Sequence, residues 1–422
     1  MASLWKRLQQ NRHLQSLAIA LAVIGPGLVT ANADNDAGGI TTYASVGAAY
    51  GYEMLWGLLL ITISLGIVQE MSARMGAVTG KGLSDLIREE FGVKWTVVAM
   101  LTLLLSNMAT TASEFAGIAA AMEIFGVSRY VAVPVAGVLL WLAVVKGSYR
   151  QLEKFFLALS LVFATYIVSG FLARPAWPVV LRSLFVPTFR WEPRFVTLFI
   201  GLIGTTITPW MQFYLQSSVV DKGISAKDYR WTRLDVLFGA FVTDFVSFFI
   251  IVSTAATLHR AGILVETAKD AALALRPLAG NYATILFATG LLGASVLAAS
   301  ILPLSTAYAI CEAFGWESSV SRRFDEAPVF FSLFTFLMIF GMAVVLIPGL
   351  SLVKLMLFAQ IVCGILVPII MIFQLRLVNN RRLMGEHVNG PVYNAITWIT
   401  VGFVNLLTVL LIVFTLFPGV WR

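Results

Sequence analysis

The stretch ADNDAGGI at residues 33–40 interrupts an apolar run, residues 16–50, that is long enough to cross a membrane. A charge near the centre of a bilayer costs at least about 2.5 kcal/mol, so two acids one residue apart are unfavourable in a continuous helix. The two glycines that follow weaken a helix further. We therefore expect an unwound segment here, called the first break, with its acids facing a polar cavity.

The rest of the chain has the composition of a membrane protein. Of its 422 residues, 59% are hydrophobic and only 12% are charged, and the mean hydropathy is +0.87. A soluble domain carries about 25% charged residues, which excludes a soluble enzyme, a disordered chain and a secreted disulfide scaffold. We attribute the net charge of +7 to cytoplasmic loops and expect no nucleic-acid partner.

Eleven apolar runs are long enough to cross a bilayer and predict an all-α membrane protein. They are residues 16–50, 54–77, 95–124, 129–146, 152–173, 195–220, 233–258, 281–311, 327–347, 350–377 and 392–418. Lys and Arg gather in alternate loops, which predicts a multi-pass protein of the cell inner membrane with a cytoplasmic N-terminus and an extracytoplasmic C-terminus. A cleavable signal peptide is less favoured because cleavage would remove the first span.

The sixth apolar run contains a second break, GTTITPW at residues 204–210. Its proline removes a main-chain hydrogen bond from the helix. Broken helices at corresponding positions of two halves are typical of transporters built from inverted repeats. We expect a single transport domain, residues 1–422, with a first repeat at 16–173, an inverted second repeat at 195–377 and an extra helix at 392–418.

The two breaks supply oxygen atoms suited to a hard cation. The candidate metal ligands are the carboxylates of Asp36 and Asp34, the main chain at Gly39, the hydroxyls of Thr205, Thr206 and Thr208, and the amide of Gln360 in the tenth span. Each has an ordinary structural alternative: an Asp caps the following helix, a Thr bonds back to its own helix, and a Gln bonds between helices. Trp210 either walls the cavity or packs.

Neither break contains a Cys or His, and Met211 lies beyond the second break. Sites made of oxygen atoms alone suit Mg²⁺, Ca²⁺ and Mn²⁺, whereas thioether and imidazole ligands favour transition metals. Mg²⁺ also keeps several of its waters when it binds to protein. This absence predicts a transported Mg²⁺ ion that stays largely hydrated, and no resident cofactor.

A few other ionisable residues lie inside the apolar runs. Glu70 and Arg74 are four residues apart on one helix, which predicts a structural ion pair or a part in a proton path. Glu114 serves a proton or water path, or pairs with an arginine. All three histidines fall in termini or loops, so no histidine is placed to relay protons within the membrane.

Several motifs stand out along the chain: QEMSARMG at residues 69–76, TGKGL at 79–83, ATTASEFAG at 109–117 and QSS at 216–218. Together they resemble the motifs of the Nramp family of divalent-metal transporters. The resemblance covers nearly the whole chain and implies a LeuT-like fold of eleven helices, with a metal site between helices 1 and 6, both broken.

The two breaks depart from the pattern of that family. Its Asp-Pro-Gly-Asn reads DAGG at residues 36–39, and its Met-Pro-His reads TPW at 208–210. A site without the Asn, the thioether and the His is similar to that of the Nramp-related magnesium transporters of prokaryotes. That branch implies transport of hydrated Mg²⁺, and also Mn²⁺, without obligatory proton coupling.

The leading hypothesis is uptake of Mg²⁺ or Mn²⁺ by alternating access in a lipid bilayer, with no enzymatic activity. Two positive charges gain about 4.6 kcal/mol at −100 mV, which drives uptake without protons. A proton-coupled Mn²⁺ or Fe²⁺ transporter that uses Glu114 is the alternative within this class. An intramembrane aspartyl hydrolase that pairs Asp36 with Asp244 is the alternative outside it. The sequence does not determine the oligomeric state.

Overall fold

The computed structural model describes residues 35–146, 161–227, 229–317 and 324–417, and no β-strand occurs in these ranges. The helices within the predicted spans are α4 (Ala37–Tyr50), α5 (Leu55–Thr79), α6 (Leu83–Ile124), α7 (Arg129–Val145), α9 (Thr165–Leu172), α11 (Pro193–Thr206), α12 (Pro209–Asp221), α13 (Tyr229–Thr257), α16 (Ala283–Phe314), α17 (Pro328–Val345), α18 (Leu352–Val378) and α20 (Pro391–Leu416). The connecting helices are α10 (Trp177–Phe185), α14 (Ala268–Ala272), α15 (Arg276–Ala279) and α19 (Arg381–Met384).

Helices or parts of helices in the described ranges correspond to the eleven predicted spans, the fifth of which is described only from residue 161 onward. Eight are long and apolar enough to cross a membrane, and two shorter apolar helices occupy the fourth and fifth spans. The first span is described from residue 35 onward, where α4 forms its second half. The predicted all-α membrane architecture is confirmed.

The third helix begins earlier than predicted. The apolar run starts at residue 95, whereas α6 already begins at Leu83 and passes through a non-helical residue, Gly92, at φ 75°. The segment before Gly92 is rich in charged residues, so hydropathy did not mark it as part of the span. Only a glycine adopts this φ at little cost in free energy. The kink at Gly92 changes the direction of the polar segment that precedes it relative to the rest of α6.

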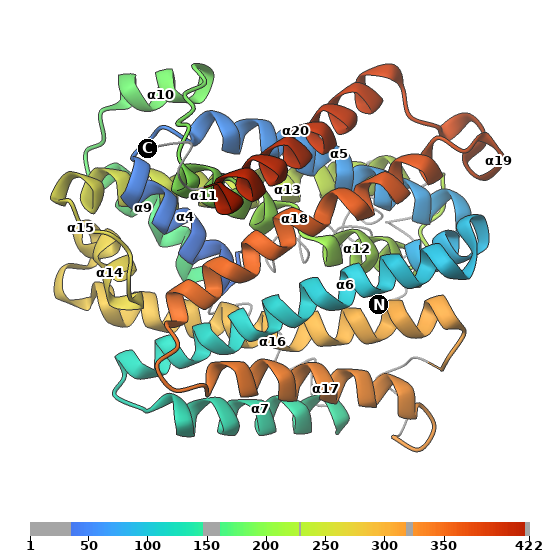
Figure 1. The fold of residues 1–422 in the computed structure, drawn as a ribbon, viewed down its shortest axis with the longest axis horizontal. Helices are drawn as coiled ribbons and strands as arrows, with labels where there is room; N and C mark the ends of the chain where they lie inside the picture. Colours follow the sequence, from blue (N-terminus) through green and yellow to red (C-terminus); the bar gives the residue numbers. More distant parts are fainter. Residues whose placement is uncertain (1–34, 147–160, 228, 318–323, 418–422) are drawn as a thin grey trace, which may run out of the picture.

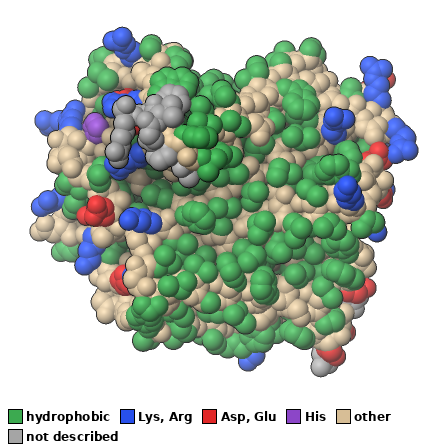
Figure 2. Space-filling model, in the orientation of Figure 1, with side chains coloured by type: hydrophobic (Ala, Val, Ile, Leu, Met, Phe, Trp, Pro, Cys, Tyr) green, Lys and Arg blue, Asp and Glu red, His purple; other side chains and the backbone are tan. Residues whose placement is uncertain are grey.

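The helices run side by side across the molecule, and their connections gather at two opposite ends (Figure 1). Helices α10, α14 and α15 lie at one end and α19 lies at the other. Hydrophobic side chains cover the middle of the face shown in Figure 2, whereas charged side chains lie mostly near its edges. This arrangement fits a bilayer whose normal runs along the helices.

Two glycines bring α11 and α18 into main-chain contact. A Cβ atom on Gly204 would lie 2.0 Å from the carbonyl oxygen of Gln360, and one on Gly364 would lie 2.3 Å from the carbonyl oxygen of Ile200. Small residues allow this close crossing of membrane helices. The end of α11 is therefore held against the middle of α18, which carries the side chain of Gln360.

Candidate metal site

The first break ends at Asp36, which caps helix α4. Asp36 has extended backbone angles, and its Oδ1 atom accepts a hydrogen bond of 2.6 Å from the main-chain N–H of Gly39. The side chain is buried, with 4% of its surface exposed. The capping alternative for Asp36 is therefore confirmed, and a carboxylate that caps with one oxygen keeps a second oxygen for a ligand. Asp34 lies outside the described residues.

Gly39 does not supply a freed carbonyl. It lies in the first turn of α4, where each carbonyl accepts from the N–H four residues later. The helix starts two residues before Gly39, at Ala37, so the prediction of Gly39 as a metal ligand would rest on the second lone pair of a helical carbonyl.

The second break is confirmed at Ile207 and Thr208. Helix α11 ends at Thr206, the two residues have non-helical angles, and α12 begins with Pro209 as its first residue. Proline suits this position because the first helical N–H has no partner within the helix. The last carbonyls of α11 and the first N–H groups of α12 thus meet at one place.

Glu114 on α6 lies directly beside the first break. Its Oε2 atom accepts a hydrogen bond of 3.2 Å from the main-chain N–H of Ala37, and its carboxyl is within hydrogen-bonding reach of the Asp36 carboxyl. The predicted alternative of a pair between Glu114 and an arginine is wrong, because its carboxyl faces Asp36 and the start of α4. Two buried carboxyls in contact are stable when they share a proton or hold a cation between them. We call Asp36 and Glu114 the acid pair.

Gln360 reaches the first break from α18, as predicted. A Cβ atom on Gly38 would lie 1.9 Å from its Nε2 atom and 2.9 Å from the hydroxyl oxygen of Ser113 on α6, and the Gln360 amide interacts with Asp36. Gly38 is therefore needed for the close approach of these side chains. Sequence reasoning missed Ser113, although it lies next to Glu114 in the quoted motif.

The three threonines of the second break differ in their partners. The hydroxyls of Thr205 and Thr208 are buried and have no hydrogen-bond partner among the described residues. The Thr206 hydroxyl donates to the Leu202 carbonyl at 2.9 Å and lies 2.9 Å from the Tyr43 hydroxyl. The Thr205 and Thr208 hydroxyls are thus available to a ligand. The Thr206 hydroxyl instead bonds back to its own helix, which was the predicted structural alternative for a threonine.

A sequence model of one protein family matches most of this chain. The family model described as "Natural resistance-associated macrophage protein-like", or Nramp, matches residues 27–414. The chain belongs to the Nramp family. The relatives of this Nramp protein include a "Divalent metal cation transporter MntH" of Bacillus subtilis, 27% identical over 94% of this chain and 92% of the relative. Another relative of the same name, from Chromohalobacter salexigens, is 29% identical over 87% of this chain and 85% of the relative.

Solved structures share the fold of this Nramp protein. The manganese transporter of Eremococcus coleocola superposes with a TM-score of 0.73 at 22% identity, over 92% of this chain and 85% of the other. Mhp1, a nucleobase-cation-symport-1 family transporter, superposes with a TM-score of 0.57 at 14% identity, over 92% of this chain and 90% of the Mhp1 chain. The predicted LeuT-like fold is confirmed.

The side chains next to the second break pack within the protein. Trp210 is buried, and its ring centroid lies 5.7 Å from that of Tyr214. The Sδ atom of Met211 accepts from Nε2 of Gln69 at 3.8 Å. Trp210 therefore has the packing role that was the alternative to a cavity wall, and the Met211 thioether is occupied by helix α5.

Sequence reasoning missed one soft side chain, Cys363 of α18. It follows Gln360 by three residues, which places both on one face of the helix. The thiol is buried, lies 3.4 Å from the Ser106 hydroxyl and is near enough to the Asp36 carboxylate for electrostatic interaction. No group of three or more His, Cys, Asp or Glu able to hold a metal occurs in the described ranges.

Glu70 and Arg74 form the predicted ion pair. Arg74 Nη2 lies 3.2 Å from Glu70 Oε2, and both side chains are almost fully buried. Arg74 also donates to the carbonyls of His387 and Val388, at 3.0 and 3.3 Å, and to the Asn389 side chain. The pair thus fixes the loop before α20 to α5, which is a structural role.

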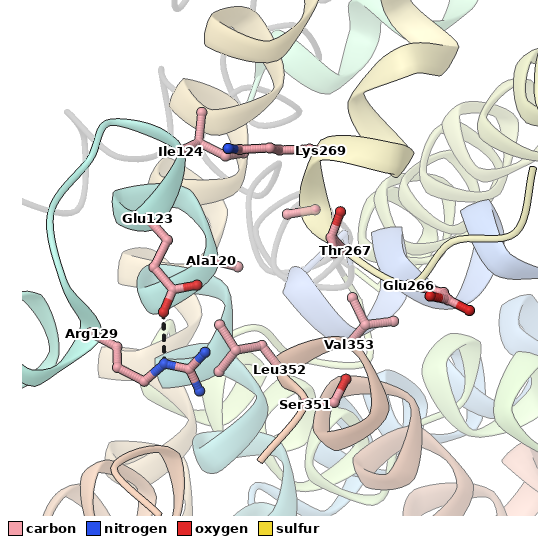
Figure 3. A pocket seen from close by; sticks show the side chains of 11 residues that line it. Ala120, Glu123, Ile124, Arg129, Glu266, Thr267, Lys269, Ser351, Leu352 and Val353 are labelled. Atoms are coloured by element: carbon pink, nitrogen blue, oxygen red, sulfur yellow. Dashed lines mark hydrogen bonds and ion pairs between the residues drawn. The ribbon is translucent and has the colours of Figure 1, made fainter. Parts of the chain in front are cut away.

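A cavity of about 420 Å³ lies at the end of the molecule that carries α14 (Figure 3). Its lining includes Glu123 and Arg129, which form an ion pair of 2.6 Å, and Val353 of α18. Two residues of this lining lie on the same helix as Glu114. Glu123 follows Glu114 by nine residues, and Ala120 follows Glu114 by six residues, a distance of about 9 Å along α6. The cavity therefore lies about two helical turns from the acid pair.

Proposed function

We propose that this Nramp protein transports a divalent metal cation, bound between the two breaks with Asp36 as its principal charged ligand. The acid pair carries the proposal, because two carboxylates balance the two charges of such an ion. The unpartnered hydroxyls of Thr205 and Thr208 offer further oxygen atoms at the neighbouring break.

Two kinds of observation bear on the identity of the transported ion, and they favour different ions. The names of the relatives refer to divalent metal cations and to manganese, which favours Mn²⁺, the alternative of the sequence analysis, over Mg²⁺. The absence of His and thioether from both breaks supports Mg²⁺ as a second ion. Carboxylate, carbonyl and water ligands suit Mg²⁺ and Mn²⁺ alike, so we propose Mn²⁺ as cargo and Mg²⁺ as its competitor.

We assign transport to alternating access in the cell inner membrane, with the N-terminus in the cytoplasm. In this orientation the cavity near Glu123 and Arg129 faces outward and gives the ion its access to the breaks. The acid pair also fits the proton-coupled alternative, because carboxyls that share a proton release it when a metal ion arrives. The hydrolase alternative lacks such support, because the carboxyl beside Asp36 is that of Glu114 rather than Asp244.

Uptake of Mn²⁺ into proteoliposomes, followed with a metal-quenched dye in the lumen, tests the site. Asp36→Asn should reduce uptake by about tenfold or more, since it removes the negative charge that balances the positive charge of the ion. Thr205→Val and Thr208→Val should raise KM, whereas Thr206→Val should keep the wild-type KM because its hydroxyl is bonded within the protein. Wild-type uptake by the folded Asp36→Asn variant would refute the site.

Two additions to this assay address the ion and the coupling. External Mg²⁺ at millimolar concentration should compete with Mn²⁺; unchanged Mn²⁺ uptake would contradict the magnesium part of the proposal. A pH-sensitive dye in the lumen distinguishes uncoupled from proton-coupled transport, since only the latter acidifies the lumen as Mn²⁺ enters. If acidification occurs, Glu114→Gln should diminish it, because the variant cannot release a proton.

A further inference from the structure

Asp244, at the middle of α13, is a buried carboxylate without a use in the site described above. Only 3% of its surface is exposed, and neither carboxylate oxygen has a hydrogen-bond partner among the described residues. The neighbouring Phe241 and Phe245 are exposed to the lipid side, at 57% and 40%. An isolated charge within a membrane is costly, and no Lys or Arg of the described ranges pairs with Asp244, so its charge calls for a bound cation.

No charged side chain in the described ranges compensates Asp244. Thr62 of α5 is the polar side chain that interacts with Asp244, but its hydroxyl proton is donated to the Leu58 carbonyl at 2.8 Å. The Thr62 oxygen therefore keeps a lone pair that a cation beside Asp244 can use. This environment differs from that of the acid pair, in which a second carboxyl is in contact.

Oxygen atoms of α5, α13 and the first break lie in the same part of the molecule as this carboxylate. Ser247 follows Asp244 by three residues on α13 and so lies on the same face of the helix. Its hydroxyl is fully buried and lies 3.3 Å from Oδ1 of Asn35, the residue that precedes Asp36 in the first break. A carboxylate, two hydroxyls and an amide carbonyl thus belong to one region between α5, α13 and the first break.

We propose that Asp244, with the oxygen atoms of Ser247, Asn35 and Thr62, binds a sodium ion at a site separate from the acid pair. One carboxylate balances one positive charge, whereas the acid pair balances two. Carbonyl and hydroxyl oxygens complete the shell of a hard cation, and the absence of nitrogen and sulfur donors disfavours a transition metal.

The first break connects this site with the acid pair. Asn35 contacts Ser247 of α13, whereas the next residue, Asp36, faces Glu114 of α6. A sodium ion that holds Asn35 against α13 therefore fixes the start of α4 and the direction of the Asp36 carboxylate. The binding of sodium itself does not depend on the proposed metal transport.

Direct binding of ²²Na⁺ to the purified full chain tests this site. In choline buffer, wild-type protein should bind ²²Na⁺ saturably, and unlabelled Na⁺ should displace it. Asp244→Asn, which keeps the shape but removes the charge, should lower the affinity by about tenfold or more. Asp36→Asn should lose Mn²⁺ uptake and retain ²²Na⁺ binding, which separates failure of this site from failure of the proposed function.

A second variant guards against misfolding of Asp244→Asn. Ser247→Ala removes one neutral ligand, should elute as a folded monodisperse protein, and should weaken ²²Na⁺ binding several-fold. Absence of ²²Na⁺ binding to the folded wild-type protein, as expected if Asp244 holds only a proton, would overturn the proposal. Equal binding by the wild type and by both folded variants would overturn it as well.

Discussion

The close crossing of α11 and α18 makes a prediction that a single methyl group can test. A Cβ atom on Gly204 would lie 2.0 Å from the Gln360 carbonyl oxygen, 2.3 Å from the Gly364 nitrogen and 2.7 Å from the Gly364 Cα atom. All three are main-chain atoms, so no side chain can turn aside. A carbon–oxygen contact between helices needs about 3.3 Å, so the helices must separate by roughly 1.3 Å.

Gly204→Ala should therefore destabilise the folded protein by about 1–3 kcal/mol, the usual cost of overpacking, or by more because the main chain must move. It should also impair Mn²⁺ uptake, because α11 leads to Thr205 and α18 carries Gln360. The thermal midpoint in detergent and the uptake rate in proteoliposomes measure the two effects.

Gly201→Ala is the matched control on the same helix. Its Cβ atom would lie 3.6 Å from Ile361 Cγ1 and 3.6 Å from Thr42 Cγ2, which are ordinary contacts. We expect a thermal midpoint and an uptake rate close to those of the wild type. If Gly204→Ala proves as stable and active as Gly201→Ala, then the two helices do not cross as closely as described.

Three further substitutions test the buried ion pair of α5, an exposed ion pair and the kink in α6. Arg74→Ala leaves Glu70 buried without its partner and should cost about 3–5 kcal/mol, measured by thermal unfolding; Lys81→Ala breaks an exposed pair and should cost less than about 1 kcal/mol. Gly92→Ala should cost about 1 kcal/mol in the same assay despite free space around it, because its φ of 75° strains any side chain. A loss for Lys81→Ala equal to that for Arg74→Ala, or an unchanged midpoint for Gly92→Ala, would contradict these assignments.

The spans that the structure describes, the start of α4 after Asp36 and the second break were predictable because their signals are local in sequence. A run of about twenty apolar residues identifies a span without knowledge of its neighbours. The glycines after Asp36 and the proline at position 209 disturb a helix wherever it lies. The pair of Glu70 and Arg74 likewise depends only on a spacing of four residues.

The partner of Glu114 was not predictable in the same way. Its contacts at the first break join residues 77 positions apart in the chain, and they arise only when α6 packs beside α4. The proximity of Cys363 to Asp36 also depends on packing, in this case of α18 against α4. A single sequence contains no pattern that specifies such pairs. The exact start of α4 at Ala37, before Gly39, was likewise not predictable, because the exact first residue of a helix depends on its cap.

The length of α6 has a consequence for the depth of the acid pair. From Trp95, half exposed at one end, to Ile124 the helix has 30 residues and measures about 45 Å, whereas the hydrocarbon core measures about 30 Å. The extra length extends into the interfacial regions or is taken up by tilting, and a thinner bilayer is matched by further tilting. Tilting shifts Glu114 relative to the start of α4, so we expect acyl-chain length to control how closely the two carboxyls meet.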